Sequence, residues 1–247
     1  MTAPVLVTIP PSHYCEKARW ALDRARVAYR EEGHAPLVHY LFVLPRSRSR
    51  TVPILFRDGH APITESSDII RFADESLAPH ERLFPSEPPL AEEVESWVKR
   101  FDDELGPPIR RHAYCYIAKD RDLFLDVFEG TLSPGERLVV RGGQSLFRAA
   151  LRKAFAVSDR AIDKTRRQVE AVFDDVSRTL SDGRPFLTGE RFTAADLTFA
   201  ALAAPLLAPP IRASLLPARL AETTRVAQAT PAGALGVRLL AERKKPV

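Results

Sequence analysis

The chain has 247 residues, enough for one large domain or two modest ones, and its 45% hydrophobic and 28% charged residues are ordinary for a globular protein. The net charge is +4, but the basic residues are spread along the chain and no basic run is interleaved with aromatic side chains, so we expect no nucleic acid partner. The longest apolar stretch, residues 197–211, is too short and too rich in proline to span a bilayer.

The two cysteines, Cys15 and Cys115, do not make a disulfide framework, which favours a reducing compartment. The first residues carry no basic stretch ahead of their short apolar run and no clear cleavage site, so we expect no signal peptide. We therefore expect a cytoplasmic protein with no membrane partner, and we expect no metal site.

The first part of the chain predicts a strand, a helix and a second strand. Residues 4–10 are rich in valine and isoleucine and bounded by proline, which favours a buried strand. Residues 13–26 predict a helix, because apolar residues recur at spacings of three and four. A strand over residues 27–31 would complete a right-handed parallel unit, and residues 35–45 favour an irregular helix.

The next part predicts a hairpin and then helices. Residues 52–57 predict a strand, Asp58-Gly59 predicts a tight turn with a return through Ile63, and residues 66–77 predict a helix. Beyond the hairpin no strand signal is convincing, and helix-compatible patterns occupy residues 91–118, 121–130, 144–156, 158–181, 193–206 and 219–243. The sequence thus predicts a small α/β domain over residues 1–79, a proline-rich linker over 80–90, and an all-helical domain over 91–247.

Three short motifs carry a family resemblance: Ser12 to Arg19 (SHYCEKAR), Thr51-Val52-Pro53 and Glu65-Ser66. In this order and at these separations they resemble the glutathione-binding half of a cytosolic glutathione transferase of the bacterial-like, serine-type kind. The resemblance implies a thioredoxin-like N-terminal domain followed by an all-α C-terminal domain. It also implies a glutathione transferase, which joins the thiolate of its co-substrate glutathione to an electrophilic small molecule, and a possible homodimer.

Ser12 lies where the first strand leads into the first helix. The free N–H groups of a first helical turn favour a nearby anion, and a hydroxyl that donates to the sulfur of glutathione would stabilise its thiolate. The resemblance therefore implies that Ser12 is catalytic and contacts glutathione. The alternative is that Ser12 only caps the helix.

The spacing from Ser12 to Cys15 is that of the C-x-x-C motif of thioredoxins and glutaredoxins, with the first cysteine replaced. A resolving thiol without an attacking thiol cannot run a dithiol cycle, so a glutathione-dependent reductase is disfavoured. We expect Cys15 to be a small buried residue. Tyr14 is a possible hydroxyl donor to glutathione, with packing as the alternative.

In the family the proline that corresponds to Pro53 is cis, and Val52 would offer its backbone N–H and C=O to the cysteinyl part of glutathione. The alternative is a trans proline that opens an ordinary strand. Glu65-Ser66 would hold the γ-glutamyl end: Ser66 and the helix N-terminus would bind its carboxylate, and Glu65 would meet its ammonium group. The alternative is a helix start without a ligand.

The glycyl carboxylate of glutathione needs a donor from the second helix or its loop. His39 is the candidate that we favour, and the arginine run over residues 46–50 is more typical of a solvated loop. In the helical half, Thr193 and Asp196 predict a capping box that resembles the family's buried helix. Residues that could line an electrophile pocket are Asp102, Arg111, His112, Tyr114 and Tyr116.

Two function classes remain open. The first is the enzyme, with an electrophile held between the domains. The second is a non-catalytic module of the same fold that binds glutathione or a protein. Affinity for glutathione without turnover of any electrophile would favour the second.

Overall fold

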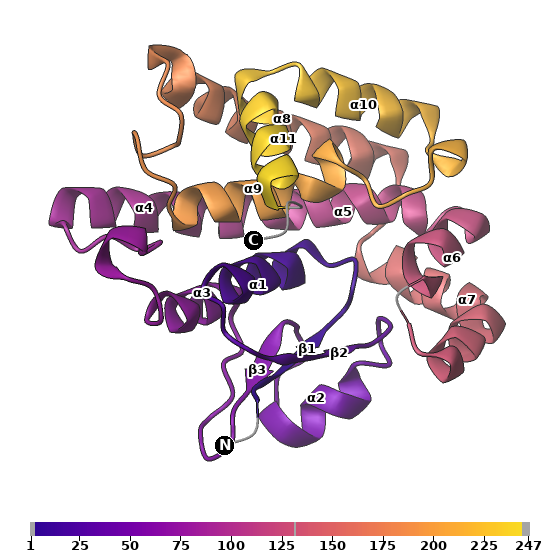
Figure 1. The fold of residues 1–247 in the computed structure, drawn as a ribbon. Helices are drawn as coiled ribbons and strands as arrows, with labels where there is room; N and C mark the ends of the chain where they lie inside the picture. Colours follow the sequence, from indigo (N-terminus) through magenta and orange to yellow (C-terminus); the bar gives the residue numbers. More distant parts are fainter. Residues whose placement is uncertain (1–2, 131, 244–247) are drawn as a thin grey trace.

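The computed structural model describes residues 3–130 and 132–243 of the chain. An α/β half and a helical half pack side by side (Figure 1). This is the thioredoxin-like domain with an all-α domain that the sequence predicts. Within the described ranges, every helix is too short or too polar to cross a membrane.

The sheet has three strands in the order β2-β1-β3. Strand β1 (Val5–Thr8) pairs in parallel with β2 (Arg30–Gly33) and antiparallel with β3 (Ile54–Phe56). The return strand of the hairpin is reduced to a single bridge between Leu55 and Ile63. Three helices flank this sheet: α1 (His13–Arg24) and α3 (Ser66–Asp74) cover one face, and α2 (Tyr40–Ser47) lies on the other (Figure 1).

Strand β2 begins three residues later than the predicted 27–31. The reason is the end of α1, where the N–H of Arg26 donates to the Asp23 carbonyl and the N–H of Val27 donates to the Leu22 carbonyl, both at 3.0 Å. Arg26 adopts a left-handed conformation at φ 53°, so these residues close the helix before the chain can extend.

Two hydrophobic cores, the first of them around α9, are enclosed by the helices of the second half. These helices are α4 (Pro88–Arg100), α5 (Gly106–Ile117), α6 (Arg121–Glu129), α7 (Pro134–Ala154), α8 (Asp159–Thr179), α9 (Ala194–Leu207), α10 (Ala218–Gln228) and α11 (Pro231–Arg243). Nearly every residue of α9 is buried, and α9 packs against α1, α4, α5, α10 and α11. The capping box of Thr193 and Asp196 is present at its start, which confirms that prediction.

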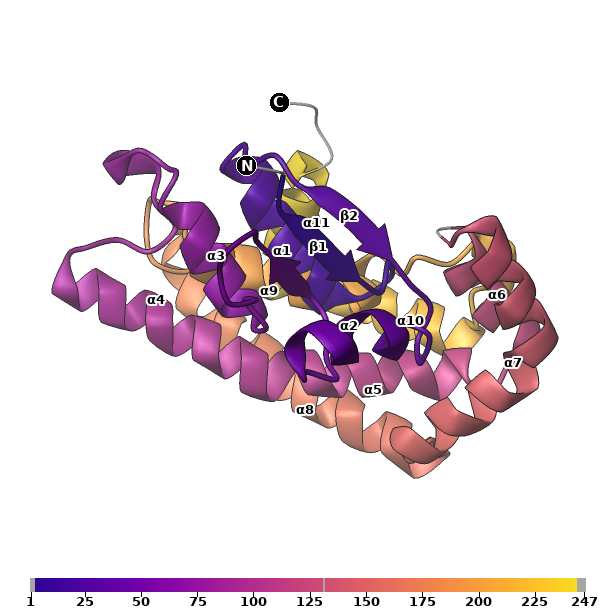
Figure 2. The same cartoon turned by 90° about the horizontal axis from the view of Figure 1, so that it is seen from below.

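Two of the predicted helices are each divided into separate segments in the structure. The helix predicted over residues 91–118 is interrupted by a π-helical turn (Phe101–Leu105), although α4 and α5 still form one long rod (Figure 2). Pro107 and Pro108 follow this turn, and because proline has no N–H the regular helical hydrogen-bond pattern cannot continue through them. The helix predicted over residues 219–243 is two helices, since Pro231 starts α11 afresh.

Helix α7 starts at Pro134, ten residues before the predicted 144–156. Ser133 caps it by accepting a hydrogen bond from the N–H of Glu136 at 3.3 Å. This cap and the proline at the first turn extend the helix through Gly142 and Gly143, which have low helix propensity.

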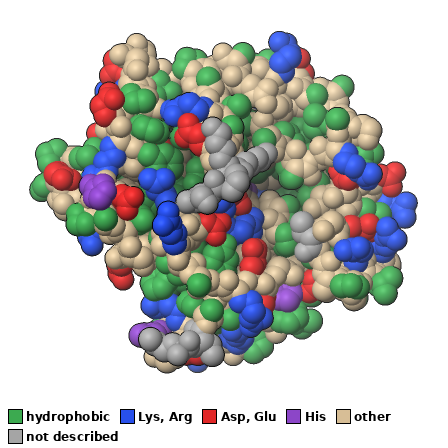
Figure 3. Space-filling view, in the orientation of Figure 1, with side chains coloured by type: hydrophobic (Ala, Val, Ile, Leu, Met, Phe, Trp, Pro, Cys, Tyr) green, Lys and Arg blue, Asp and Glu red, His purple; other side chains and the backbone are tan. Residues whose placement is uncertain are grey.

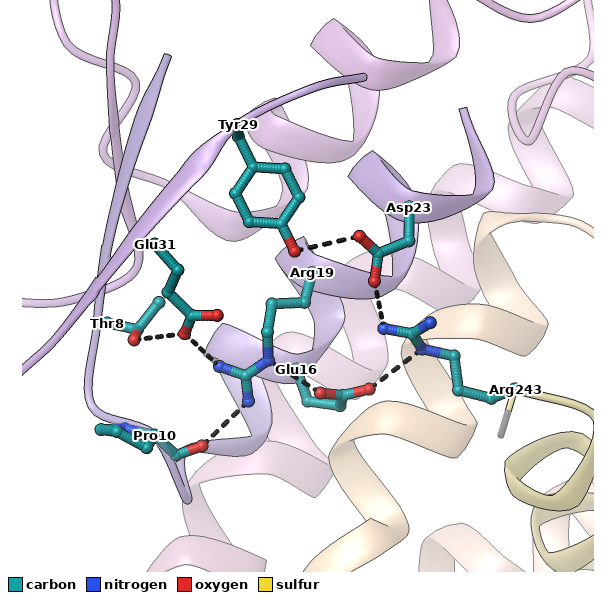
Figure 4. Close-up of polar contacts among 8 residues, drawn as sticks. All are labelled: Thr8, Pro10, Glu16, Arg19, Asp23, Tyr29, Glu31 and Arg243. Atoms are coloured by element: carbon teal, nitrogen blue, oxygen red, sulfur yellow. Dashed lines mark hydrogen bonds and ion pairs between the residues drawn. The ribbon is translucent and has the colours of Figure 1, made fainter. Parts of the chain in front are cut away.

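Arg243, the last residue of α11, joins the two halves. Its guanidinium donates to Glu16 at 3.1 Å and to Asp23 at 2.5 Å, both on α1 (Figure 4). The thioredoxin-like half is therefore held against the helical half by an ion pair as well as by the packing of α1 on α9. On the outer surface of this face, positive and negative side chains are interspersed (Figure 3).

Candidate functional site

Ser12 stands at the N-cap of α1 with extended backbone angles. Its N–H donates to the Ile9 carbonyl at 2.9 Å, and within the described residues its hydroxyl makes no capping hydrogen bond. The side chain is half-buried and borders a narrow hollow of about 50 Å³ toward the helical domain. The hydroxyl is thus not used to cap its own helix, and it lies at a boundary between the domains.

Arg19 fixes the loop that leads to Ser12. Its guanidinium donates to the Pro10 carbonyl, to Glu31 and to Glu16, each at 2.9 Å, as Figure 4 shows. Glu31 also accepts a hydrogen bond from Thr8 at 2.6 Å. This network ties the end of β1, strand β2 and the first turns of α1 into one unit, so the position of Ser12 is set by the sheet.

Cys15 is fully buried one turn after Ser12. Burial raises the pKa of its thiol to about 11, and the Ser12 hydroxyl only partly opposes that shift. The thiol is therefore protonated at neutral pH and is a poor nucleophile. This agrees with the expectation that Cys15 is a small core residue.

Tyr14 turns away from Ser12 toward the domain boundary. Its hydroxyl donates to the carbonyl of Asp102 at 3.0 Å, and burial raises the pKa of the phenol. The guanidinium of Arg110 lies over the ring, 5.5 Å from its centroid. Gly106 packs against this hydroxyl so closely that a Cβ would approach it to 2.2 Å.

Lys17 links α1 to the start of α3 and to the π-helical turn. Its ammonium group is fully buried and donates to Ser67 at 2.7 Å and to both carboxylate oxygens of Asp102 at 2.7 and 2.8 Å. Ser67 in turn donates to Asp102 at 2.6 Å. Burial lowers the pKa of Lys17, and Asp102 opposes that shift. The sequence prediction missed this cluster because Asp102 lies 85 residues from Lys17.

Glu65 and Ser66 stand at the N-terminus of α3, where the first-turn N–H groups are free to bind an anion. Glu65 is the exposed N-cap residue, and its side chain makes no capping bond among the described residues. Ser66 is buried at 7% exposure. Since Ser67 is held by Lys17 and Asp102, the start of α3 is fixed with respect to α1.

The Val52–Pro53 peptide bond is cis, which confirms the expectation. Val52 precedes β3, and throughout the described ranges its backbone N–H and C=O make no hydrogen bond. His39 is buried, with Nε2 3.2 Å from the carbonyl of Arg50, and burial lowers its pKa. His39 therefore supports the loop just before Val52.

Of the five candidates for an electrophile pocket, the structure places Tyr114 in the hollow beside Ser12. Asp102 pairs with Lys17, and Arg111 donates to the carbonyls of Phe155 and Ala156. His112 lines a different cavity, and Tyr116 belongs to the core cluster that α5 forms mainly with α6, α7 and α8.

Arg110 is the residue of this site that the sequence prediction missed. It borders the hollow beside Ser12. Burial and, to a smaller extent, the charge of Arg110 lower the pKa of the neighbouring His13 to about 3. In the described part of the chain Arg110 forms no ion pair, and its guanidinium lies between the rings of Tyr14 and Phe155. Its spacing of four from Tyr114 on one helix was the signal available, because such residues share a face.

The remaining walls of this hollow are apolar. They are formed by Pro11, Ala113, Ile117, Val127, Phe128, Pro205, Pro210, Ile211 and Leu220. A second hollow of about 160 Å³ lies on the other side of Ser12, against Pro10, Arg19 and Pro210. Ser12 borders both hollows, whereas Val52, Glu65 and Ser66 line neither.

Comparison with known proteins agrees with the fold described above. Residues 6–80 match the family model described as glutathione S-transferase, N-terminal domain. A comparison of the sequence with curated proteins finds no match.

Solved structures similar to the chain include the β-etherase LigF from Sphingobium sp. strain SYK-6, at 17% identity and a TM-score of 0.63, with 96% of this chain and 100% of that chain covered. Glutathione transferase F7 from Populus trichocarpa is 15% identical with a TM-score of 0.60, and covers 99% of this chain and 100% of its own. A possible glutathione S-transferase from Rhodopseudomonas palustris is 15% identical with a TM-score of 0.63, over 98% and 96% of the two chains. At these identities the likeness of the whole chain concerns the fold, while residues 6–80 match the N-terminal domain of glutathione S-transferases.

Proposed function

We propose that the protein is a glutathione transferase that joins the sulfur of glutathione to an electrophilic small molecule, with Ser12 as the catalytic residue. The observation that carries the proposal is the position of Ser12. Its hydroxyl stands at the amino end of α1, is not used to cap that helix among the described residues, and borders an apolar hollow between the domains.

In this mechanism the Ser12 hydroxyl donates a hydrogen bond to the sulfur of bound glutathione. The bond favours the thiolate over the thiol, so the thiol proton is lost to solvent at a lower pH. The sulfur then forms a bond to the electrophilic carbon, and the leaving group departs with the electron pair of the broken bond. Arg110 supports the step, since a cation without an ion-pair partner in the described structure stabilises a nearby anion.

The rest of glutathione is assigned to the thioredoxin-like domain. The unpaired N–H and C=O of Val52, beside Pro53, would hold the cysteinyl backbone, and Glu65 and Ser66 would hold the γ-glutamyl end. His39 would act indirectly by holding the Arg50 carbonyl and thereby the loop before Val52. Tyr14 would contribute to the shape of the site, because its hydroxyl already donates to Asp102.

The electrophile would occupy the apolar hollow bounded by Tyr114, Phe128 and Ile211. We also propose a homodimer in the cytoplasm, where a reducing environment suits two buried free cysteines.

One observation favours a second candidate function, a module that binds glutathione without catalysis. The hollow beside Ser12 measures about 50 Å³, which is close to the space of one or two water molecules and smaller than a usual ligand pocket. An electrophile would have to displace side chains to enter.

The test is a panel of electrophiles with glutathione, using the wild-type protein and Ser12→Ala. We expect turnover in the wild type and a loss of at least tenfold in kcat in Ser12→Ala, with glutathione affinity measured by calorimetry nearly unchanged. Glutathione binding without turnover of any member of the panel would establish the binding module instead. Absence of glutathione binding would refute both candidates.

A further inference from the structure

The helical domain holds a further, roomier cavity on the far side of α5 from Ser12. It measures about 340 Å³, which falls in the range of small-molecule sites, and it lies between α5, α8, α9 and α10. We propose that this cavity binds a neutral, largely apolar small molecule that carries one hydrogen-bond donor, such as an alkylphenol or a long alcohol. The proposal does not depend on catalysis at Ser12.

The walls of the cavity are suited to an apolar body. Its apolar lining consists of Ile109, Val169, Phe173, Leu206, Val226 and Ala227. Val226 of α10 is 49% exposed. Exposure of an aliphatic side chain to water is unfavourable. A ligand in the cavity would cover part of that side chain.

His112 supplies a single polar atom for orientation. The ring is 96% buried, because its relative exposure is 4%, and it lines the cavity. Its Nδ1 lies 3.2 Å from Oγ1 of Thr165, and Nε2 has no hydrogen-bond partner among the described residues. A buried polar atom without a partner is costly, and a ligand that satisfied Nε2 would recover that cost.

The hydrogen bonds around Thr165 show which kind of partner Nε2 requires. The Thr165 hydroxyl donates to the Ala161 carbonyl at 2.8 Å, so its oxygen accepts from the N–H at Nδ1 of His112. Burial lowers the pKa of His112 to about 4, so the ring is neutral at pH 7. With its proton on Nδ1, the ring presents Nε2 as an acceptor, and the ligand must bring an O–H or N–H group.

The charges at the edge of the cavity favour a neutral ligand over an anion. Arg166 pairs with Glu170, Arg219 with Asp163, and Glu222 with Arg225, at 2.5, 2.5 and 2.6 Å. Each arginine of the lining thus already has an acidic partner. The remaining charged side chain of the lining, Asp174, would repel a carboxylate or phosphate.

Helix α5 separates this cavity from the proposed active site. Arg110, Ala113 and Tyr114 face the hollow beside Ser12, whereas Ile109 and His112 face the cavity. The two sites therefore have separate linings on α5, and occupation of one does not require the other.

The experiment is calorimetric titration with para-propylphenol and with para-propylanisole, its methyl ether, which has the same body but lacks the donor. In the wild type we expect the phenol to bind about five- to tenfold more tightly than the ether, the effect of one additional neutral hydrogen bond. In His112→Phe the two probes should bind with equal affinity. Glutathione should not compete with the phenol, and Ser12→Ala should leave its affinity unchanged.

A second variant tests the proposal even if His112→Phe fails to fold. Val226→Trp fills the edge of the cavity and should weaken both probes at least tenfold. Val237→Trp places the same large ring on α11, at a similarly exposed valine that does not line the cavity, and should leave both affinities unchanged. Equal binding of phenol and ether to the wild type, no binding of either, or competition by glutathione would each overturn the proposal.

Discussion

Lys17 of α1, whose side chain is buried, and the partly exposed Asp102 of the π-helical turn form an ion pair across the boundary between the two halves of the molecule. Nζ lies 2.7 Å from Oδ1 and 2.8 Å from Oδ2, and no part of the lysine side chain is exposed. The pair also holds Ser67, in the first turn of α3, beside the proposed glutathione-binding residues. It therefore connects domain packing to the geometry of the site.

Lys17→Met should lower the free energy of unfolding by about 1–3 kcal/mol, because it leaves the partly buried Asp102 carboxylate without its cation. Chemical denaturation measures the change. The double variant Lys17→Met, Asp102→Leu removes both charges and should lose less than the single variant. If the double variant is as unstable as Lys17→Met or worse, the unpaired carboxylate is not the cause.

Glu65→Ala and Ser66→Ala should each weaken glutathione binding by about 1–3 kcal/mol, which is about 5- to 150-fold in Kd, the usual effect of losing a charged hydrogen-bond partner. Calorimetric titration measures this. Asp68→Ala is the matched control, since Asp68 is an exposed acid in the same first turn of α3 and has no proposed contact. Unchanged affinity in both test variants would rule out the start of α3 as the γ-glutamyl site.

Cys15→Ala should affect stability more than activity. The thiol is buried and protonated, so its loss leaves a small cavity that costs about 1–2 kcal/mol, while turnover should stay near the wild-type value. Ser12→Cys, in contrast, should gain thiol-exchange activity, because a cysteine at a helix N-terminus has a lowered pKa. Loss of turnover in Cys15→Ala combined with an unaffected Ser12→Ala would establish a thiol mechanism in place of ours.

Arg110→Met should shift the pH profile of turnover toward higher pH, by about one unit, because the cation near Ser12 no longer stabilises the glutathione thiolate. Arg111→Met is the matched control: it removes the same charge one residue later, but that guanidinium binds the end of α7. A shift of equal size in both variants would mean that only net charge matters.

The protein should lose stability in mild acid because two buried histidines are held neutral. Burial lowers the pKa of His112 from 6.5 to about 4 and that of His13 from 6.5 to about 3. Below pH 6.5 the unfolded chain takes up protons that the folded protein does not, so the free energy of unfolding falls as the pH drops toward 4.

The contribution of His112 to this loss is at most about 3 kcal/mol over that interval. Thermal or chemical denaturation at a series of pH values would measure it. His112→Phe should flatten the dependence between pH 6.5 and 4, whereas replacement of the exposed His60 with phenylalanine should leave it unchanged. A steeper dependence in His112→Phe would contradict this account.

Local sequence was sufficient for the elements whose signals lie within a few residues. The start of α1 after Ser12, the tight turn at Asp58-Gly59 and the capping box of Thr193 and Asp196 all depend on near neighbours in the chain. The order of these elements also indicated the thioredoxin-like domain and the helical domain, since each type of secondary structure has its own hydrophobic period. The motifs at Ser12, Val52-Pro53 and Glu65-Ser66 carried the resemblance to the family through their residue types, order and separations.

Tertiary structure decided which side chains of those elements meet. Periodicity shows that a helix has a buried face, but it does not identify the residue that a distant element brings to that face. Lys17 could be recognised as buried only once Asp102 was in place, and the opposite roles of Arg110 and His112 depend on what packs against each side of α5. Local patterns determined the fold and the proposed reactive centre. Contacts between residues far apart in the chain determined the charges, the protonation states of the side chains and the cavity volume around that centre.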